Sequence, residues 1–219
     1  MKKIDYIVPF GLLLIFLLII PTVKSQEIEN EFQLRTSLKL GFKLVKHVKV
    51  SFVPEIRFND DFSVDKYQME GAIDYRAFKL VSFGGSYRFV VNLRDVKETE
   101  YLSRYALDVT FKKKFDRFKP SFRFQYTNDN DDDEDAASIF MRYKASLEYN
   151  IPKTKITPTV GVEAFQQLDD GQLYKMRYSL GFDYKLFKHN YIGLGYKLDF
   201  YMNEYKNKHI VEFQYVYSF

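Results

Sequence analysis

Arginine side chains recur on the polar parity of a long apolar/polar alternation, where they can bind carboxylates or anionic solutes. Six of them, which we call the arginine belt, lie at similar depth near the longer connections: Arg57, Arg88, Arg104, Arg123, Arg142 and Arg177. Eight acidic residues share their parity: Glu55, Glu70, Asp108, Glu148, Glu163, Asp183, Asp199 and Glu212. A guanidinium donates two parallel hydrogen bonds to a carboxylate or phosphate. The belt is therefore predicted to act by ion pairing or by anion recognition.

Two interpretations of the belt stay open, and they differ in whether water fills the space that it faces. In a narrow lumen filled by side chains, Arg104, Arg123 and Arg142 should each pair with an inward carboxylate, because buried charges need partners. The candidate partners are Glu70, Glu163 and Glu212. In a wet lumen, the belt would select small anionic solutes. The leading interpretation is a structural or interaction protein with a charge-plugged lumen, and the alternative is a narrow pore.

Catalytic residues are harder to find in this sequence. His47 and His189 fall in short connections, and His209 has apolar parity beside no obvious serine. Ser–His–acid catalysis requires these groups within hydrogen-bond reach, so a lipid-modifying enzyme is only the third alternative. The chain contains no Cys, which excludes disulfides, thiol nucleophiles and zinc–thiolate sites. We expect no catalytic residue, no cofactor and no metal.

An acidic run at 129–135 has part of the spacing of a calcium loop. Asp129, Asp131 and Asp133 alternate as in an EF-hand, but the sixth position is Glu134 instead of Gly and the twelfth is Phe140. We interpret the run as a solvated loop, which divalent ions could bridge to lipid headgroups.

The elements that carry these residues are predicted to be strands. Apolar and polar residues alternate with a period of two from Phe32 to Phe219, which indicates strands with two different faces. The apolar positions group into segments at 32–44, 48–58, 67–75, 81–91, 101–111, 118–126, 139–149, 156–162, 174–186, 192–200 and 211–219. Most are longer than the usual strand of a soluble sandwich. They suit tilted strands that cross a membrane.

The connections between the segments are of two kinds that take turns along the chain. Short basic ones lie at 46–47, 76–79, 112–117, 152–155 and 185–189. Longer, mostly acidic or mixed ones lie at 59–65, 92–100, 127–137, 166–172 and 202–208. Tight periplasmic turns and longer extracellular loops are typical of outer-membrane barrels.

The predicted fold is therefore all-β, a transmembrane antiparallel up-and-down β-barrel of about 10–12 strands. We expect both termini near the periplasm and the acidic loops outside. The segments from Val48 onward make ten strands, and segment 32–44 makes an eleventh, although bacterial single-chain barrels have even numbers. Either the first segment pairs after the N-terminus has threaded the lumen, or a further crossing gives twelve.

Residues 1–25 have the features of a cleavable signal peptide. Lys2 and Lys3 form a basic start, an apolar core follows at 7–20, and Val23 and Ser25 occupy the positions of a small-residue cleavage site. The alternative is an uncleaved anchor, because the uncharged stretch 6–23 approaches transmembrane length. We predict cleavage, secretion to the outer membrane, and one barrel domain at 26–219.

The predicted partners follow from the apolar face and from the last strand. Outward tyrosines near segment ends suit interfacial girdles in contact with outer-membrane lipid. The final segment ends on an aromatic residue and resembles the signal that the outer-membrane insertion machinery reads, carried by Tyr215, Tyr217 and Phe219. The net charge is +4, and about +2 without the first 25 residues, which is too balanced to indicate nucleic acid.

The order of several short phrases resembles a known family. EIRF at 55–58, SYRF at 86–89, RYALDVTF at 104–111 and PSFRFQYT at 120–127 are followed by MRYKASLEYN at 141–150, PTVGVEAF at 158–165, MRYSLGFDYK at 176–185 and GLGYKLDF at 193–200. Together they resemble the bacterial family catalogued as domain of unknown function 2490, secreted barrels found mainly in Bacteroidota. The chain departs from that pattern in having Phe32 where such barrels often carry a Trp. The resemblance implies an outer-membrane barrel and transfers no catalytic residue.

Overall fold

The structure, a computed structural model, describes residues 29–93, 98–129, 138–202 and 206–219. These residues form eleven strands: β1 (Glu29–Val45), β2 (Val48–Phe58), β3 (Val64–Tyr75), β4 (Val81–Asn92), β5 (Glu100–Lys112), β6 (Phe118–Thr127), β7 (Phe140–Tyr149), β8 (Ile156–Gln167), β9 (Leu173–Phe187), β10 (Asn190–Tyr201) and β11 (Lys206–Ser218). The predicted all-β fold is confirmed. The predicted signal peptide, 1–25, and most of the acidic run, 130–135, lie outside the described residues.

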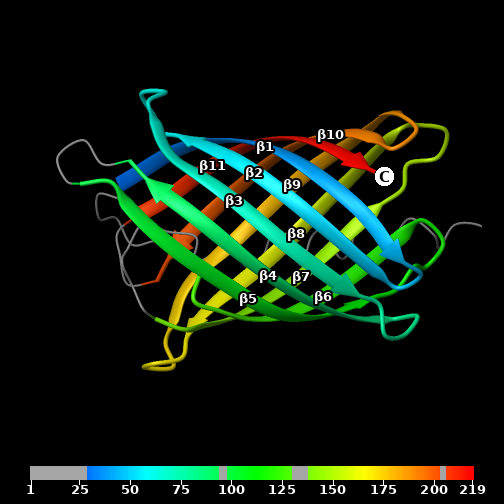
Figure 1. Ribbon diagram of the computed structural model, residues 1–219, viewed down its shortest axis with the longest axis horizontal. Coiled ribbons are helices and arrows are strands. Elements are labelled where there is room, and N and C mark those ends of the chain that lie inside the picture. The colour runs from blue at the N-terminus through cyan, green and yellow to red at the C-terminus, as the bar shows by residue number, and fades with distance from the viewer. Residues whose placement is uncertain (1–28, 94–97, 130–137, 203–205) are drawn as a thin grey trace, which may run out of the picture.

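The strands close into one barrel in which each strand pairs with its neighbours in sequence, and β1 pairs with β11 (Figure 1). The odd number of strands determines how the barrel closes. In a meander of eleven, the first and last strands run in the same direction, so the closing pair must be parallel. Its register runs from Glu29 opposite Lys206 to Gly41 opposite Ser218.

This closure corrects one expectation about the ends of the barrel. We expected both termini at the end with the short turns, but the described chain starts at Glu29 at the opposite end from Phe219. The eleven strands fall within the predicted range of about 10–12. Segment 32–44 is a full strand, β1, and it closes the barrel by pairing in parallel instead of leaving a strand unpaired.

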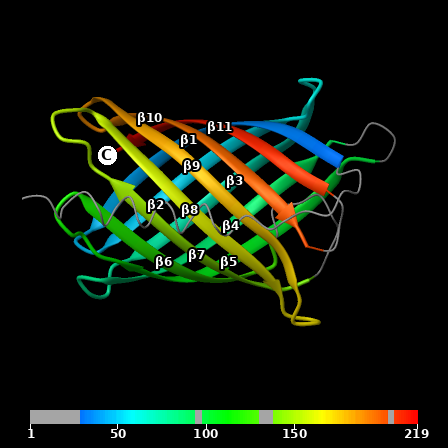
Figure 2. The ribbon, with the colours of Figure 1, turned by 180° about the vertical axis from the view of Figure 1, so that it is seen from behind.

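Successive connections lie at opposite ends of the barrel, as the sequence predicted. One end has the connections 59–63, 93–99, 128–139, 168–172 and 202–205, and the other has 46–47, 76–80, 113–117, 150–155 and 188–189. The predicted difference in length holds only in part, because 202–205 is shorter than 150–155. We call the first end the loop end and the second the turn end. They are the left and right sides of Figure 1, and Figure 2 shows the same separation from behind.

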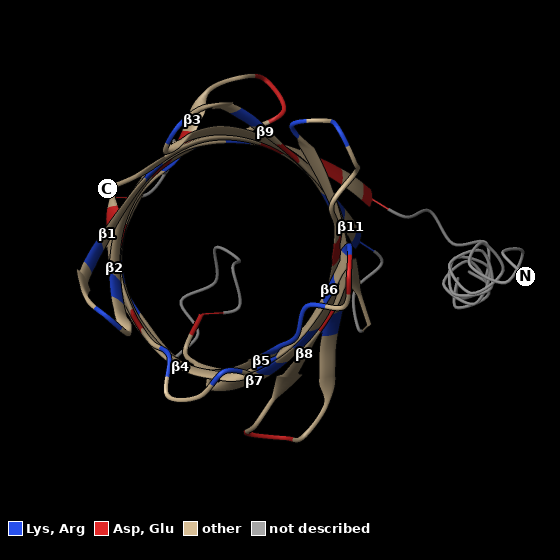
Figure 3. Ribbon diagram, turned by 90° about the vertical axis from the view of Figure 1, so that its right-hand side faces the viewer, with Lys and Arg blue, Asp and Glu red and all other residues tan. Residues whose placement is uncertain are grey.

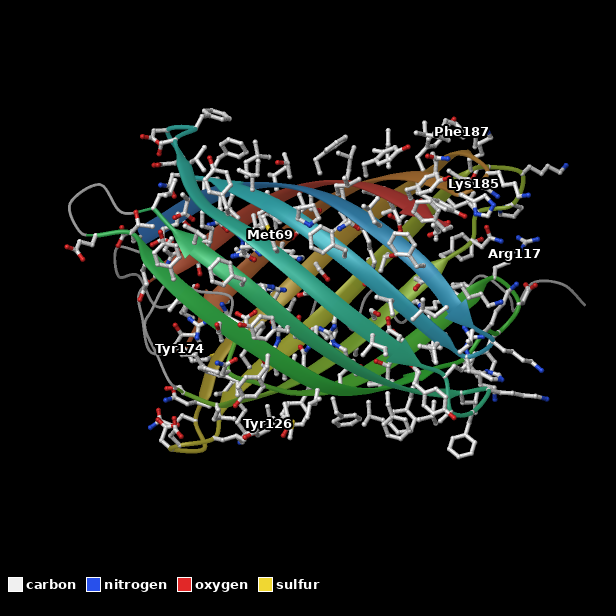
Figure 4. All side chains as sticks on the ribbon, in the orientation of Figure 1. Met69, Arg117, Tyr126, Tyr174, Lys185 and Phe187 are labelled. Carbon is white, nitrogen blue, oxygen red and sulfur yellow. The ribbon has the colours of Figure 1, made fainter. Side chains whose placement is uncertain are left out.

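The strands present an apolar face outward and a polar face inward. Large apolar side chains on the outward parity are exposed, with Met69 at 55%, Leu107 at 61% and Leu194 at 56%. In Figure 4, Met69 and Tyr126 lie at a similar position along the barrel, and Tyr174 lies nearer the loop end. A view along the axis shows the strands as a closed ring (Figure 3). The described residues include no helix long and apolar enough to cross a membrane.

Aromatic contacts cover the seam between β1 and β11. Phe219 stacks on Phe42 with ring centroids 4.4 Å apart, and Tyr217 packs edge-on against Phe219 at the same distance. Tyr215 lies on the same outward parity and hydrogen-bonds the Asn190 side chain. The three residues of the predicted insertion signal therefore lie on or beside the last strand at the turn end.

Candidate functional site: the charged lumen

Cross-strand register aligns charged side chains around the inner wall. Lys144 on β7 lies opposite Arg123 on β6 and opposite Glu163 on β8. Glu163 in turn lies opposite Arg177 on β9, which lies opposite Asp199 on β10. Directly opposed residues on one face of a sheet are close enough for their side chains to interact. The inward parity thus places cations and carboxylates next to one another within the lumen.

Glu163 is the first centre of this network. Its Oε1 accepts hydrogen bonds from Arg123 Nη2 and Arg142 Nε, both at 3.0 Å. The Glu163 side chain is 3% exposed, so the carboxylate has little access to water. One buried carboxylate therefore binds two arginines of the belt. Removing a partner of such a buried charge costs free energy of folding, because the charge stays buried without compensation.

Asp199, on β10, is the second centre of the network. It lies nearer the loop end of its strand than Glu163 does on β8. Arg177 donates from Nε and Nη2 to the two carboxylate oxygens at 2.5 and 2.6 Å, and Lys175 Nζ lies 3.1 Å from Oδ2. The side chains of Asp199 and Lys175 are fully buried. Two cations lie over the face of the Phe165 ring. The ring centroid is 4.3 Å from the Arg142 guanidinium carbon and 4.8 Å from Lys175 Nζ. Cations over an aromatic face gain additional attraction where water is excluded.

Three arginines of the belt converge on the start of the connection between β6 and β7. Arg88 Nη1 donates to Asp129 Oδ2 at 2.7 Å, Arg104 Nη1 to the Asn128 carbonyl at 2.8 Å, and Arg142 Nη1 to the Asp129 carbonyl at 3.4 Å. Asp129 is buried. The expectation of a solvated loop is therefore wrong for Asp129, because the arginines draw its carboxylate into the lumen.

Three predicted members of the network, Arg57, Arg88 and Glu212, have partners outside the Glu163 and Asp199 centres. Arg57 Nε donates to Glu55 at 2.7 Å, and Arg88 Nη2 donates to Glu70 at 2.7 Å. Glu212 accepts from Lys197 at 2.6 Å instead of from an arginine of the belt. The expected one-to-one pairing is thus replaced by a shared partner for Arg123 and Arg142, which bind the same carboxylate.

Several buried lumen residues were missed because the belt was restricted to arginines near the loop ends of six strands. Buried inward residues of the same parity include Arg35, Lys66, Lys175, Lys208 and Phe165. Arg35 Nε donates to Gln33 at 2.7 Å, and Lys208 lies 3.5 Å from Glu31. Counting parity for every residue type would have found them. Their depth would still have been unknown, because it depends on the stagger between strands.

The lumen is packed at one end and open at the other. At the loop end, the inward side chains of Arg57, Lys66, Lys175 and Asp199 are 0–2% exposed. At the turn end, the inward side chains of Lys39, Asp74 and Asp183 are exposed. A cavity of about 490 Å³ extends from Arg35 and Gln68 in mid-barrel to Glu148 and Asp183 in the turn half.

His209 lies on the outer surface in a different environment. Its Nδ1 is 2.7 Å from the Tyr196 hydroxyl, its Nε2 is 3.2 Å from Asn30 Oδ1, and its ring stacks on Phe32 at 4.8 Å. Among the described residues, these contacts provide neither the serine nor the carboxylate of a hydrolytic triad. Within the same residues, no group of three or more His, Asp or Glu side chains could hold a metal ion.

Comparison with known proteins places the chain in a family. A family model described as "Protein of unknown function (DUF2490)" matches residues 32–210. No curated protein matches the chain significantly. One solved structure, described as "Unveiling the Mechanism Behind the in-meso Crystallization of Membrane Proteins", matches over 84% of this chain and 78% of its own, with 10% identity and a TM-score of 0.41. That similarity is too low to carry an argument. Because the family model spans nearly all of the barrel, the chain belongs to the DUF2490 family of proteins of unknown function.

Proposed function

We propose that this protein is an outer-membrane β-barrel whose lumen is sealed at the loop end, and that it acts as a structural or interaction barrel. The single observation that carries the proposal is the cluster of buried charges in the loop half. Glu163 and Asp199 each bind two cations, and three arginines hold Asn128 and Asp129 inside the barrel. Side chains thus occupy the space through which a solute would have to pass.

The outer surface supports a membrane location. The exposed apolar side chains of the middle of the barrel would be costly to leave in water and suit the hydrocarbon core of a bilayer. Outward tyrosines such as Tyr67, Tyr101 and Tyr184 suit the two interfaces with lipid headgroups. A secreted chain of this kind would meet outer-membrane lipid and the insertion machinery as its first partners, the latter through Tyr215, Tyr217 and Phe219.

The orientation proposed has the loop end outside the cell and the turn end in the periplasm. Single cysteine variants can test it, because the chain contains no Cys. Asp61→Cys lies in the connection between β2 and β3 at the loop end, and Lys79→Cys lies in the turn between β3 and β4. Both residues are exposed. A membrane-impermeant maleimide added to intact cells should label only the Asp61→Cys variant.

Permeabilising the outer membrane should then make both variants equally reactive, which controls for local accessibility. Labelling of Lys79→Cys alone in intact cells would contradict the orientation. Recovery of the protein outside the outer-membrane fraction would contradict the location.

A narrow pore for small anions is the second candidate, and the cavity favours it. The wall formed by β6 to β9 carries Arg123, Arg142, Lys144, Lys175 and Arg177, and Glu163 and Asp199 neutralise only part of this charge. A pore requires the loop end to open, and a planar-bilayer recording distinguishes a pore from a sealed barrel. A catalytic role is not part of the proposal, since His209 contacts Tyr196 and Asn30 instead of a serine and a carboxylate.

A further inference from the structure

The turn half of the lumen forms a cup, because its wall carries small side chains. The 490 Å³ cavity is lined on β8 to β10 by Thr159, Ser179, Gly181, Gly193 and Gly195. Such a volume is within the range of sites that bind small molecules. The loop half closes the bottom of the cup, and the exposed inward side chains at the turn end show where it meets solvent.

Two of the glycines keep the cup open by letting carboxylates lie against the wall. A Cβ at Gly193 would come within 3.0 Å of Asp183 Oδ1, and a Cβ at Gly195 within 3.3 Å of Glu212 Oε2. These acidic side chains therefore lie across the glycines of the adjacent strand. A Cβ at either position would force the acidic side chain to shift by a few tenths of an ångström.

Lys144 lines this cup without an ion pair in the part of the chain that the structure describes. Its cross-strand neighbours are Arg123 and Glu163, and the Glu163 carboxylate is engaged by Arg123 and Arg142. Two other carboxylates of the lining have their own cationic partners, Lys197 for Glu212 and Arg88 for Glu70. A cation in a largely enclosed polar cavity favours an anion beside it.

We propose that the cup binds a small solute that carries one phosphate or carboxylate group together with hydroxyl groups, and that enters from the turn end. Lys144 binds the anionic group, because Glu163, its register partner on β8, is already engaged by Arg123 and Arg142. The Thr159 and Ser179 hydroxyls, on the adjacent strands β8 and β9, hydrogen-bond the hydroxyls of the solute. The site is independent of the seal at the loop end, so binding requires no passage through the barrel.

Isothermal titration calorimetry on the full barrel in detergent micelles tests this proposal. The probes are glucose 6-phosphate and gluconate, which separate a phosphate from a carboxylate, with glucose as the uncharged comparison. The expected result is saturable binding of at least one anionic probe with a Kd of about 1 mM or tighter and no measurable binding of glucose. Failure of both anionic probes to bind, or equal binding of glucose, would overturn the proposal.

Matched variants locate the bound probe. Lys144→Met should weaken binding at least about tenfold, while Lys144→Arg should keep most of it and Lys79→Met, which removes an exposed turn cation, should leave it unchanged. Gly181→Leu should fill the cup and abolish binding, because a Cβ there meets only the Leu194 carbonyl at 3.6 Å and needs no rearrangement. Gly71→Leu adds the same side chain where nothing lies within 4 Å, on the outward face, and should have no effect. Wild-type affinity in both Lys144→Met and Gly181→Leu would overturn the site.

Discussion

Shared carboxylates are the main feature of this lumen at the scale of single residues. Glu163 and Asp199 each bind two cations in a space nearly free of water. A buried ion pair need not stabilise a protein relative to apolar packing, since desolvation costs about as much as attraction returns. Removing one member is different, because the remaining charges lose their partner and stay buried. The acidic members therefore hold the cations in place.

Glu163→Gln should destabilise the barrel strongly, by about 3–5 kcal/mol, because Arg123 and Arg142 lose their common carboxylate. Glu148→Gln is the matched control, since Glu148 also binds two cations, Lys112 at 2.5 Å and Lys119 at 2.9 Å. Its side chain is 26% exposed and those lysines are more exposed still, so the expected loss is about 0–1 kcal/mol. Urea unfolding in lipid, followed by circular dichroism, measures both free energies.

Equal losses in the two variants would mean that water reaches Glu163 as freely as it reaches Glu148. The same reasoning predicts that Arg123→Ala loses less free energy of unfolding than Glu163→Gln does. Arg123 is 30% exposed, and Arg142 would still bind Glu163 in its absence.

The sequence predicted which residues point inward but not which of them meet. Parity is a property of one strand, so the inward placement of Arg142 and Glu163 follows from alternation alone. Their contact depends on the register between β7 and β8, and no pattern within either strand encodes it. The hydrogen bond from Arg104 to the Asn128 carbonyl could not be predicted for a further reason. Every residue has a backbone carbonyl, so the residue type does not show which carbonyl accepts the bond.

The parallel pair of β1 and β11 is the main feature at the scale of elements. Alternation predicted every strand, and the order of the connections along the chain predicted which of them share an end. Their lengths differ between the two ends only in part, because 202–205 is shorter than 150–155. The parallel closure was not predicted, because pairing of segment 32–44 was expected only with a threaded N-terminus, and the alternative was a twelfth crossing. Inside the lumen, Gln214 Nε2 on β11 donates to Ser37 Oγ on β1 at 3.0 Å. The two closing strands are therefore joined by a side-chain hydrogen bond as well as by backbone pairing.

A disulfide tests this closure directly in a chain without native Cys. Ser37→Cys combined with Gln214→Cys should cross-link on mild oxidation, because the two residues are register partners with touching side chains. Ser37→Cys with Ser218→Cys is the control, since Ser218 lies opposite Gly41, about 13 Å further along the pair. Mobility on non-reducing gels reports the bond. A cross-link in the control pair, or none in the first, would contradict the parallel register.

The whole molecule has a polarised interior that neither residues nor strands reveal separately. Buried charges fill the loop half, whereas small side chains and a cavity occupy the turn half. Composition could not predict this difference, because arginines and carboxylates occur in both the plug and the pore interpretations. The position of each charge along the barrel axis distinguishes a plug from a pore. That position depends on the stagger of the eleven strands around the closed barrel. Asp129 completes the packed end by turning into the lumen toward Arg88.

Planar-bilayer recording of the purified protein tests the sealed lumen most directly. The wild-type barrel should give no steady current. Asp129→Ala, which releases the residue that Arg88 holds in the lumen, should give transient openings with preference for anions. Asp61→Ala is the control, because Asp61 is exposed in another connection at the loop end and should leave the barrel silent. A steady, anion-selective current from the wild type, unchanged in Asp129→Ala, would contradict the seal and establish an open pore.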